Sequence, residues 1–543
     1  MKLNITHILV CVSAAVASAC TGNYLDINSN PYEVSRDQMM ADGYAMSAAM
    51  KSLCSAVIST DVNTTQLTDV LLGGVCAGYY ATSQSGFDNT VDNFNPTDDW
   101  TRVLMSSDKI IPQLYSNLAE LNTLADEPEV MAIANIVKVT AMHRVTDTFG
   151  PIPYSQIGLD GKIQVPYDSQ EAIYRLMFEQ LDEAVDVLSE ANGQLAANVD
   201  PIYNGDFKKW IKFANSLKLR LAMHVVYADR ELARQMAESA VSAGRGGVMT
   251  DNADNAQLPS TAFGKDGNPL LVSFRYNTPV HEDKKVCLTG GDSHVAADIV
   301  CYMNGYNDPR REKYFIESEW ENTESPYTGM RRGIEIPSLN ETGHKYSGVR
   351  MSFDSPLQWM NAAEVAFLRA EGAAIFGFDM GGTAKDFYET GVRLSFAQWG
   401  ASGVDEYLKD EESQPEKYTD PAGENSYDEE LSTITIAWND GASDAEKQER
   451  IITQKWIANF NLGHESWVDY RRTGYPHLLP ATQAGNKSGG IVNSKLGARR
   501  MPYPQAEFTN NAANIMQALS EYLGGPDNMA TRLWWDCNPA IAQ

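Results

Sequence analysis

Several segments of the chain repeat apolar side chains every three or four residues, and this spacing limits the fold more than any other feature. One face of an α-helix presents residues at that spacing, so each segment is expected to form a helix with one apolar side. Similar runs follow the polar pair Asp168-Ser169 and Asp206, a candidate N-cap. The clearest run, which stops at Gly150-Pro151, consists of Val130, Ile133, Val137, Ala141, Val145 and Phe149.

Helices of this kind must cover one another, because none can bury its apolar face alone. Residues Ala363, Phe367, Ala370 and Ala374 form a narrow stripe that lets a neighbouring helix approach closely. No strict 34-residue consensus repeats along the chain. The sequence therefore predicts a mainly α-helical fold of stacked helix pairs with few short strands, its helical core mainly in residues 101–243 and 356–472.

Long irregular stretches separate the helical segments. Residues 60–100 and 250–355 are rich in Gly, Asn, Asp and aromatic residues, and disordered linkers avoid aromatics. We therefore expect these two stretches to form ordered surface loops, which are usually functional when so long. Residues 402–443 form an acidic insert, expected to be a solvated flap, and residues 473–543 form a C-terminal segment.

The N-terminus has the features of a lipoprotein signal. Lys2 precedes a short apolar stretch, and small residues then lead to Cys20. Residues 1–19 are thus expected to be a signal peptide, and Cys20 to be lipidated after cleavage. The alternative is an ordinary signal peptide with a chance cysteine. More than one acyl chain gives stable anchoring, so the predicted protein is exported and lipid-anchored.

Composition and motifs exclude several functions. The net charge of -28 argues against a nucleic-acid partner, whose phosphates would be repelled. Five cysteines remain after Cys11 and Cys20, an odd and widely spaced set that indicates neither a disulfide framework nor a zinc site. His464-Glu465 lacks the second His of a zinc protease, and no Gly-x-Ser-x-Gly elbow occurs. We predict no catalytic residue, no metal and no cofactor.

The C-terminal third contains dense aromatic and basic segments. Trp456, Trp467, Arg471 and Arg472 lie in periodic or proline-bounded stretches. They are expected to pack rings and to form bidentate ion pairs that fix helices to loops.

Seven segments, in this order, resemble the SusD/RagB-like outer-membrane lipoproteins. The first three are "CTGNYLDINSNPY", "HRVTDTFGPIPYSQ" and "VPYDSQEAIYRLMFEQLDEAVDVL". The next three are "GDFKKWIKFANSLKLRLAMHV", "NDPRREKYF" and "WMNAAEVAFLRAEGAAIFG". The last comprises "QKWIANFNLGHESWVDYRRTGYP" and the final "WWD". The resemblance extends over nearly the whole chain and implies one domain over residues 20–543.

This resemblance implies a body of tetratricopeptide-like helix pairs with long ligand-binding loops. It also implies a cell-surface protein that captures a glycan and delivers it to a SusC-like TonB-dependent transporter, without catalysis. Outward-facing members usually carry acidic residues just behind the lipidated cysteine, whereas here Asp26 is the first. The expected location is the outer membrane, facing the exterior through the lipid anchor.

Candidate ligand contacts come from the two loop-rich stretches. Flat aromatic rings stack on the C–H faces of sugars, while Asn or Arg side chains bind hydroxyl groups. The candidates are Tyr79, Tyr80, Asn93, Phe94, Trp100, Trp320, Tyr327 and Arg331.

Three alternatives remain open at this point. The same fold could bind peptides, the protein could be a surface glycoside hydrolase, or it could be a scaffold that binds no ligand. A hydrolase would need two carboxylates about 5–10 Å apart, and with 71 Asp and Glu residues the sequence singles out no pair.

Overall fold

The structure is a computed structural model that describes residues 43–541, except residues 86, 88, 160, 162–163, 276–290, 322 and 338–342. The predicted signal peptide 1–19, the predicted lipidation site Cys20, and Cys287 lie outside the described residues. Among the described helices, none has the length and apolar character needed to cross a membrane.

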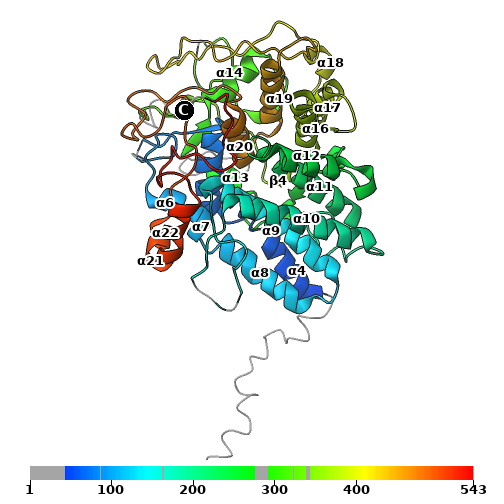
Figure 1. The fold of residues 1–543 in the computed structure, drawn as a ribbon. Coiled ribbons are helices and arrows are strands. Elements are labelled where there is room, and N and C mark those ends of the chain that lie inside the picture. Colours follow the sequence, from blue (N-terminus) through cyan, green and yellow to red (C-terminus); the bar gives the residue numbers. More distant parts are fainter. Residues whose placement is uncertain are drawn as a thin grey trace, which may run out of the picture.

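A stack of long helices forms the body of the molecule, as the apolar spacing predicts (Figure 1). Helices that follow one another in the chain pack side by side, and the α-helical fold class is confirmed. The long helices are α4 (Tyr44–Cys54), α8 (Ile111–Leu124), α9 (Pro128–Phe149), α10 (Gln170–Glu190), α11 (Phe207–His224), α12 (Arg230–Val241), α16 (Ala362–Glu371), α17 (Ala384–Trp399), α19 (Asp444–Ala458) and α20 (Gly463–Thr473).

Shorter elements lie between and after the long helices. The α-helical ones are α5 (Val62–Thr65), α6 (Asp98–Thr101), α7 (Val103–Ser106), α13 (Pro269–Arg275), α14 (Ala297–Gly305), α15 (Arg311–Tyr314), α18 (Val404–Tyr407), α21 (Gln505–Asn510) and α22 (Ala512–Glu521). The π- and 3₁₀-helical ones are η2 (Gln66–Gly74), η3 (Ala243–Arg245), η4 (Asn252–Asp254), η5 (Ser260–Ala262), η6 (Gly343–Lys345) and η7 (Gly372–Phe376).

Side-chain caps explain where the helices begin. The Ser169 side chain accepts a hydrogen bond from the backbone N–H of Ala172 at the start of α10. The Asp206 side chain accepts two from the backbone N–H groups of Lys208 and Lys209 at the start of α11. Ser443 and Glu446 form a reciprocal capping box on α19. Each cap satisfies backbone N–H groups that have no partner within the helix.

The described strands form two short antiparallel ribbons. Strand β1 (Tyr80–Thr82) pairs with β3 (Ser293–Val295), so that Ala81 lies opposite His294. Strand β2 (Ala256–Leu258) pairs with β4 (Leu357–Met360). Each ribbon therefore joins segments that are far apart in the sequence.

Residues 62–74 are helical rather than irregular. Here α5 continues into the π-helix η2, whose turn lies against the start of α20. A Cβ atom on Gly73 would lie 2.7 Å from the ring of His464, and one on Gly463 would overlap the backbone of Gly73 and Gly74. Glycine is thus needed for the two helices to meet, a contact that local sequence patterns do not reveal.

The acidic insert is more firmly attached than a solvated flap. Ile436 is fully buried, and its carbonyl accepts a hydrogen bond from the hydroxyl of Tyr388 on α17 at 2.6 Å. The carbonyl of Ile434 accepts another from Tyr306, the residue that follows α14, at 3.0 Å. The expectation was therefore wrong for the second half of the insert.

A network of buried charges joins α11, α16, α19 and α20 at the centre of the helical body. Arg220 on α11 binds both carboxylate oxygens of Glu364 at 2.6 and 2.7 Å. Lys455 contacts Glu465 and Asp469, each at 2.8 Å. Burial alone would lower the pKa of Lys455, but the neighbouring carboxylates together outweigh this effect and raise it.

Arg472 extends the same network. Its two Nη atoms bind Glu371 of α16 at 2.7 and 2.6 Å, and its Nε atom lies 3.0 Å from Asp469. Its neighbour Arg471 instead lies over the ring of Trp467 at 3.6 Å. The expected ring packing is confirmed, and so is a bidentate ion pair for Arg472, although this pair joins two helices. Arg471 instead donates to main-chain carbonyls.

Substitution of one buried partner should strongly destabilise the protein. Glu371→Gln removes one of the two carboxylates that balance Arg472, and the loss of one partner of a buried ion pair costs about 3–5 kcal/mol. Urea denaturation followed by circular dichroism measures the change in the free energy of unfolding. The matched control is Asp405→Asn, which breaks an exposed pair with Arg393 and should change stability little. Equal effects of the two substitutions would contradict the role of the network.

Candidate functional site

Loops from three parts of the chain meet around the β1–β3 ribbon. The N–H of Met330 donates to Val295 at 2.9 Å, and the N–H of Thr82 donates to Asp92 at 3.1 Å. We call the described residues of 82–100, 291–296 and 318–346 the loop face. The ribbon thus brings together the two stretches from which ligand contacts were predicted.

Tyr79 and Tyr80 lie behind this face, in the core. Tyr79 is fully buried, stacks on Trp456 at 5.6 Å, and donates its hydroxyl hydrogen bond to the Trp456 carbonyl. Tyr80 is 1% exposed, and its ring packs edge-on against Phe274 and Phe460. Both rings are covered by protein atoms, so in this structure neither tyrosine can stack on a ligand. Their burial follows from contacts with residues more than 190 positions away.

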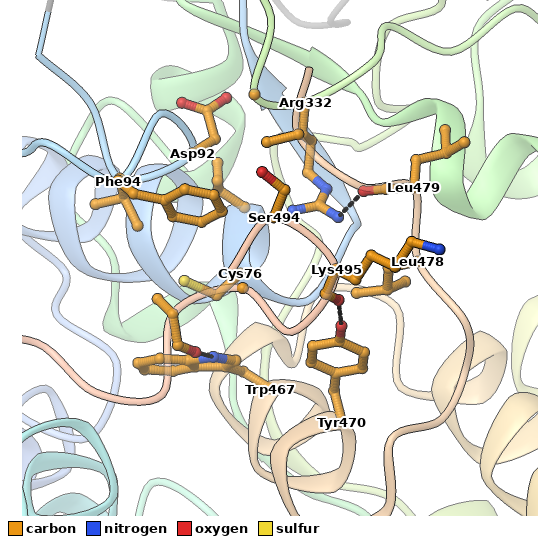
Figure 2. Close-up of a pocket in the computed structure, with 16 residues that line it drawn as sticks. Cys76, Asp92, Phe94, Arg332, Trp467, Tyr470, Leu478, Leu479, Ser494 and Lys495 are labelled. Carbon is orange, nitrogen blue, oxygen red and sulfur yellow. Dashed lines mark hydrogen bonds between the residues drawn. The ribbon is translucent and has the colours of Figure 1, made fainter. Parts of the chain in front are cut away.

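Asn93 and Phe94 shape a turn. The Oδ1 atom of Asn93 accepts from the N–H groups of Thr90 and Asn95, at 3.0 and 3.1 Å. Phe94 has a φ of 60°, and its largely buried ring points into the small pocket drawn in Figure 2. These side chains hold the early loop in place.

The pocket in Figure 2 lies where the early loop (residues 82–100), the middle loop (residues 318–346) and the C-terminal segment meet. Its volume is about 20 Å³, room for about one water molecule. Tyr470 donates to the carbonyl of Lys495 at 2.5 Å, and Trp467 donates to that of Ala498 at 3.0 Å. Burial raises the pKa of the Cys76 thiol to about 12, so Cys76 stays protonated. These hydrogen bonds hold the loops together, and the pocket between them is too small for a sugar.

Tyr327 and Arg331 are also largely buried. The ring of Tyr327 packs against Phe315 at 6.0 Å. Arg331 donates to the carbonyls of Asn425, Ser426 and Pro480 at 2.8–3.1 Å, and so ties the acidic insert to the middle loop.

Trp100 and Trp320 keep part of their rings accessible. Trp100, on α6, meets Phe87 edge-on at 5.1 Å. Trp320 packs edge-on against Tyr346 at 5.5 Å, and the Lys345 ammonium lies 4.8 Å from its ring centre. Of the eight predicted contacts, these two offer aromatic surface to a ligand.

The loop face also holds buried polar atoms without a hydrogen-bond partner among the described residues. They include the indole Nε1 of Trp320, the hydroxyls of Thr82 and Ser293, and Nε2 of His294. Buried polar atoms are normally paired, so unpaired ones mark places where a ligand or water can bind.

Lys345, Tyr346 and His294 were not predicted. Tyr346 donates to Asp420 of the acidic insert at 2.7 Å, which orients the ring against Trp320. The only local signal is an aromatic residue next to a cation in the middle loop. His294 lies in the three-residue strand β3, and nothing in the neighbouring sequence indicates that it would be buried beside the loop face.

Neither a disulfide nor a metal cluster occurs among the residues that the structure describes. Cys54, Cys76, Cys301 and Cys537 are free. No group of three or more His, Cys, Asp or Glu side chains in those residues is arranged to hold a metal ion.

Comparison with known proteins identifies the family of this chain. A family model described as SusD-like, "Susd and RagB outer membrane lipoprotein", matches residues 26–536. The chain belongs to the SusD-like family. The suspected resemblance is thereby confirmed, together with the tetratricopeptide-like helical fold. A search of curated proteins found no match.

Solved structures agree with this assignment. A SusD homolog from Bacteroides uniformis is 56% identical, with a TM-score of 0.87, covering 92% of this chain and 100% of its own. A SusD homolog from Bacteroides thetaiotaomicron is 38% identical (TM-score 0.81), covering 90% and 98%. A chitin-binding SusD homolog from Flavobacterium johnsoniae is 35% identical (TM-score 0.82), covering 91% and 99%.

Stability of this SusD-like protein should fall in mild acid, partly through His294. Burial lowers the pKa of His294 to about 3, far below the ordinary value of about 6.5. Between these values the unfolded chain binds a proton that the folded chain does not. The neutral, buried His294 therefore makes its full contribution to the free energy of unfolding above pH 6.5, and this contribution is lost as the pH falls toward 3.

Over the interval from pH 7 to pH 5, this loss is about 2 kcal/mol. His294→Gln can still bind Ser83, which lies 2.8 Å from Nδ1, but cannot titrate. Urea denaturation at both pH values should show a pH dependence smaller by that amount in the variant. An unchanged pH dependence would show that His294 titrates normally in the folded state.

Proposed function

We propose that this SusD-like protein is a cell-surface lipoprotein that captures oligosaccharides at the loop face and delivers them to a SusC-like TonB-dependent transporter. The observation that carries the proposal is the partly exposed ring of Trp320, which packs edge-on against Tyr346 and has the Lys345 ammonium 4.8 Å from its centre. Family membership supports it, and so does the similarity to a chitin-binding SusD homolog.

Stacking on a single ring gives weak binding. Burial of about 50 Å² of apolar surface contributes about 1.3 kcal/mol, which is close to a tenfold change in affinity. Useful affinity therefore needs further contacts with accessible side chains of the loop face. Trp100, on the same face, is a second candidate platform.

A membrane tether makes weak capture useful. A protein anchored beside the transporter shares a small volume with its entrance, which raises the effective concentration of bound cargo without any new contact. The lipid anchor at Cys20 would supply this tether, with the body facing the cell exterior.

The proposed role is non-catalytic. Glycoside hydrolysis needs two available carboxyl groups, whereas three buried ones at or near the loop face, on Asp92, Asp298 and Asp420, are engaged in structural contacts. Asp298 accepts two hydrogen bonds from Arg332 at 2.9 Å, and Asp420 accepts from Tyr346 and the backbone of its own loop. Asp92 binds Thr82 and Thr90.

Affinity electrophoresis of residues 21–543 against a panel of polysaccharides tests the proposal. We expect retardation by at least one polysaccharide, without shortening of that polymer. Trp320→Ala should weaken this binding five- to tenfold, because the stacking surface is lost.

The matched control is Trp438→Ala. Trp438 is also partly exposed, but its ring lies 5.4 Å from Tyr388 on α17, and its indole binds Asp440 in the insert. This variant should bind like the wild type. Equal losses in both variants would remove Trp320 from the site. Retention of peptides alone would assign a peptide ligand, and shortening of the polymer would make the protein a hydrolase.

A further inference from the structure

A second cavity lies between the β2–β4 ribbon, the end of α17 and the turn after α19. Its volume is about 210 Å³, below the roughly 300–1,000 Å³ of sites for drug-sized ligands. A space of that size suits one sugar ring. The residues that line it include Gln257, Arg350, Gln398, Trp399, Phe460 and Asn461.

A chain of amide groups fixes one wall of this cavity. Asn255 donates to Gln398 at 3.2 Å, Gln398 donates to Gln358 at 3.4 Å, and Gln358 donates to the carbonyl of Met360 at 2.6 Å. These contacts position the wall before any ligand arrives. Preorganised walls lower the entropy lost on binding.

The polar atoms left over in this cavity are mainly donors. The indole Nε1 of Trp399 is buried and has no hydrogen-bond partner among the described residues. Arg350 uses Nε to bind the carbonyl of Phe315 at 3.2 Å, while neither Nη atom binds a described residue. Asn461 accepts from the Tyr80 hydroxyl, and its Nδ2 atom forms no hydrogen bond to the described part of the chain.

The charge of the cavity is unusual for this protein. The chain has 71 acidic and 43 basic residues, yet none of the described residues that line this cavity is Asp or Glu. Arg350 is the charged residue of the lining. Glu312 lies within electrostatic range of Arg350, but its carboxylate is already 2.9 Å from the ammonium of Lys313.

We propose that this cavity binds one unit of an acidic sugar, a hydroxylated ring that carries a carboxylate. The carboxylate would accept from the two Nη atoms of Arg350, a geometry that suits the planar guanidinium. A ring hydroxyl would accept from Trp399 Nε1, and the apolar face of the sugar would lie against Phe460. The site is separate from the loop face and does not depend on capture at Trp320.

The test uses residues 21–543 with sodium D-glucuronate and D-glucose as probes, measured by ligand-observed NMR titration. We expect D-glucuronate to bind at least tenfold more tightly than D-glucose. Arg350→Met should weaken D-glucuronate binding at least tenfold, and Trp399→Phe, which keeps a ring but removes the N–H donor, three- to tenfold. Circular dichroism establishes that each variant is folded.

Two control variants separate this site from other effects. Arg393→Met removes an exposed arginine of α17 that pairs with Asp405, and should leave D-glucuronate binding unchanged. Trp320→Ala should also leave it unchanged, so failure of either proposed site is distinguishable from failure of the other. Absence of D-glucuronate binding, equal binding of D-glucose, or full binding by Arg350→Met would overturn the proposal.

Discussion

The buried charge network at the centre of the helical body is the constraint on which the rest of the structure depends. Arg220, Lys455 and Arg472 supply positive charge to four carboxylates from α16 and α20. Removal of two charges from water is favourable only when the remaining hydrogen bonds are also made. The four helices therefore have very few relative positions that satisfy every group. Apolar packing alone would tolerate small slides between helices, whereas this network does not.

The same helices hold the loops. Trp456 donates to the carbonyl of Ala77, just before β1, and Arg471 donates to the carbonyls of Asp147 and Arg499. A rigid core thus sets the backbone of segments that have little regular structure of their own. Such a division suits a receptor, because the core can be kept while the loops determine which ligand is bound.

Local patterns in the sequence were enough to predict most of the long helices, but not the short helices within the loop-rich stretches or which aromatic residues face solvent. Helix α9 ends at Phe149, before the Gly150 that the sequence indicates as a stop, because periodicity and caps are properties of neighbouring residues. Tyr79 looks in sequence like any loop aromatic, and its burial depends on Trp456, 377 positions away. The setting of Trp320 depends equally on Tyr346 and Asp420. Family resemblance gave the fold, whereas only three-dimensional contacts distinguish accessible rings from buried ones.

The hydrogen bonds from Arg331 to the acidic insert affect which mutations the insert can tolerate. Its guanidinium binds three main-chain carbonyls, and every amino acid offers the same carbonyl. The docking of residues 425 and 426 through this contact therefore places no demand on their side chains. Mutations could therefore change the charge and length of side chains at this point of the insert, and hence the charge of the protein surface there, while the loop stays docked.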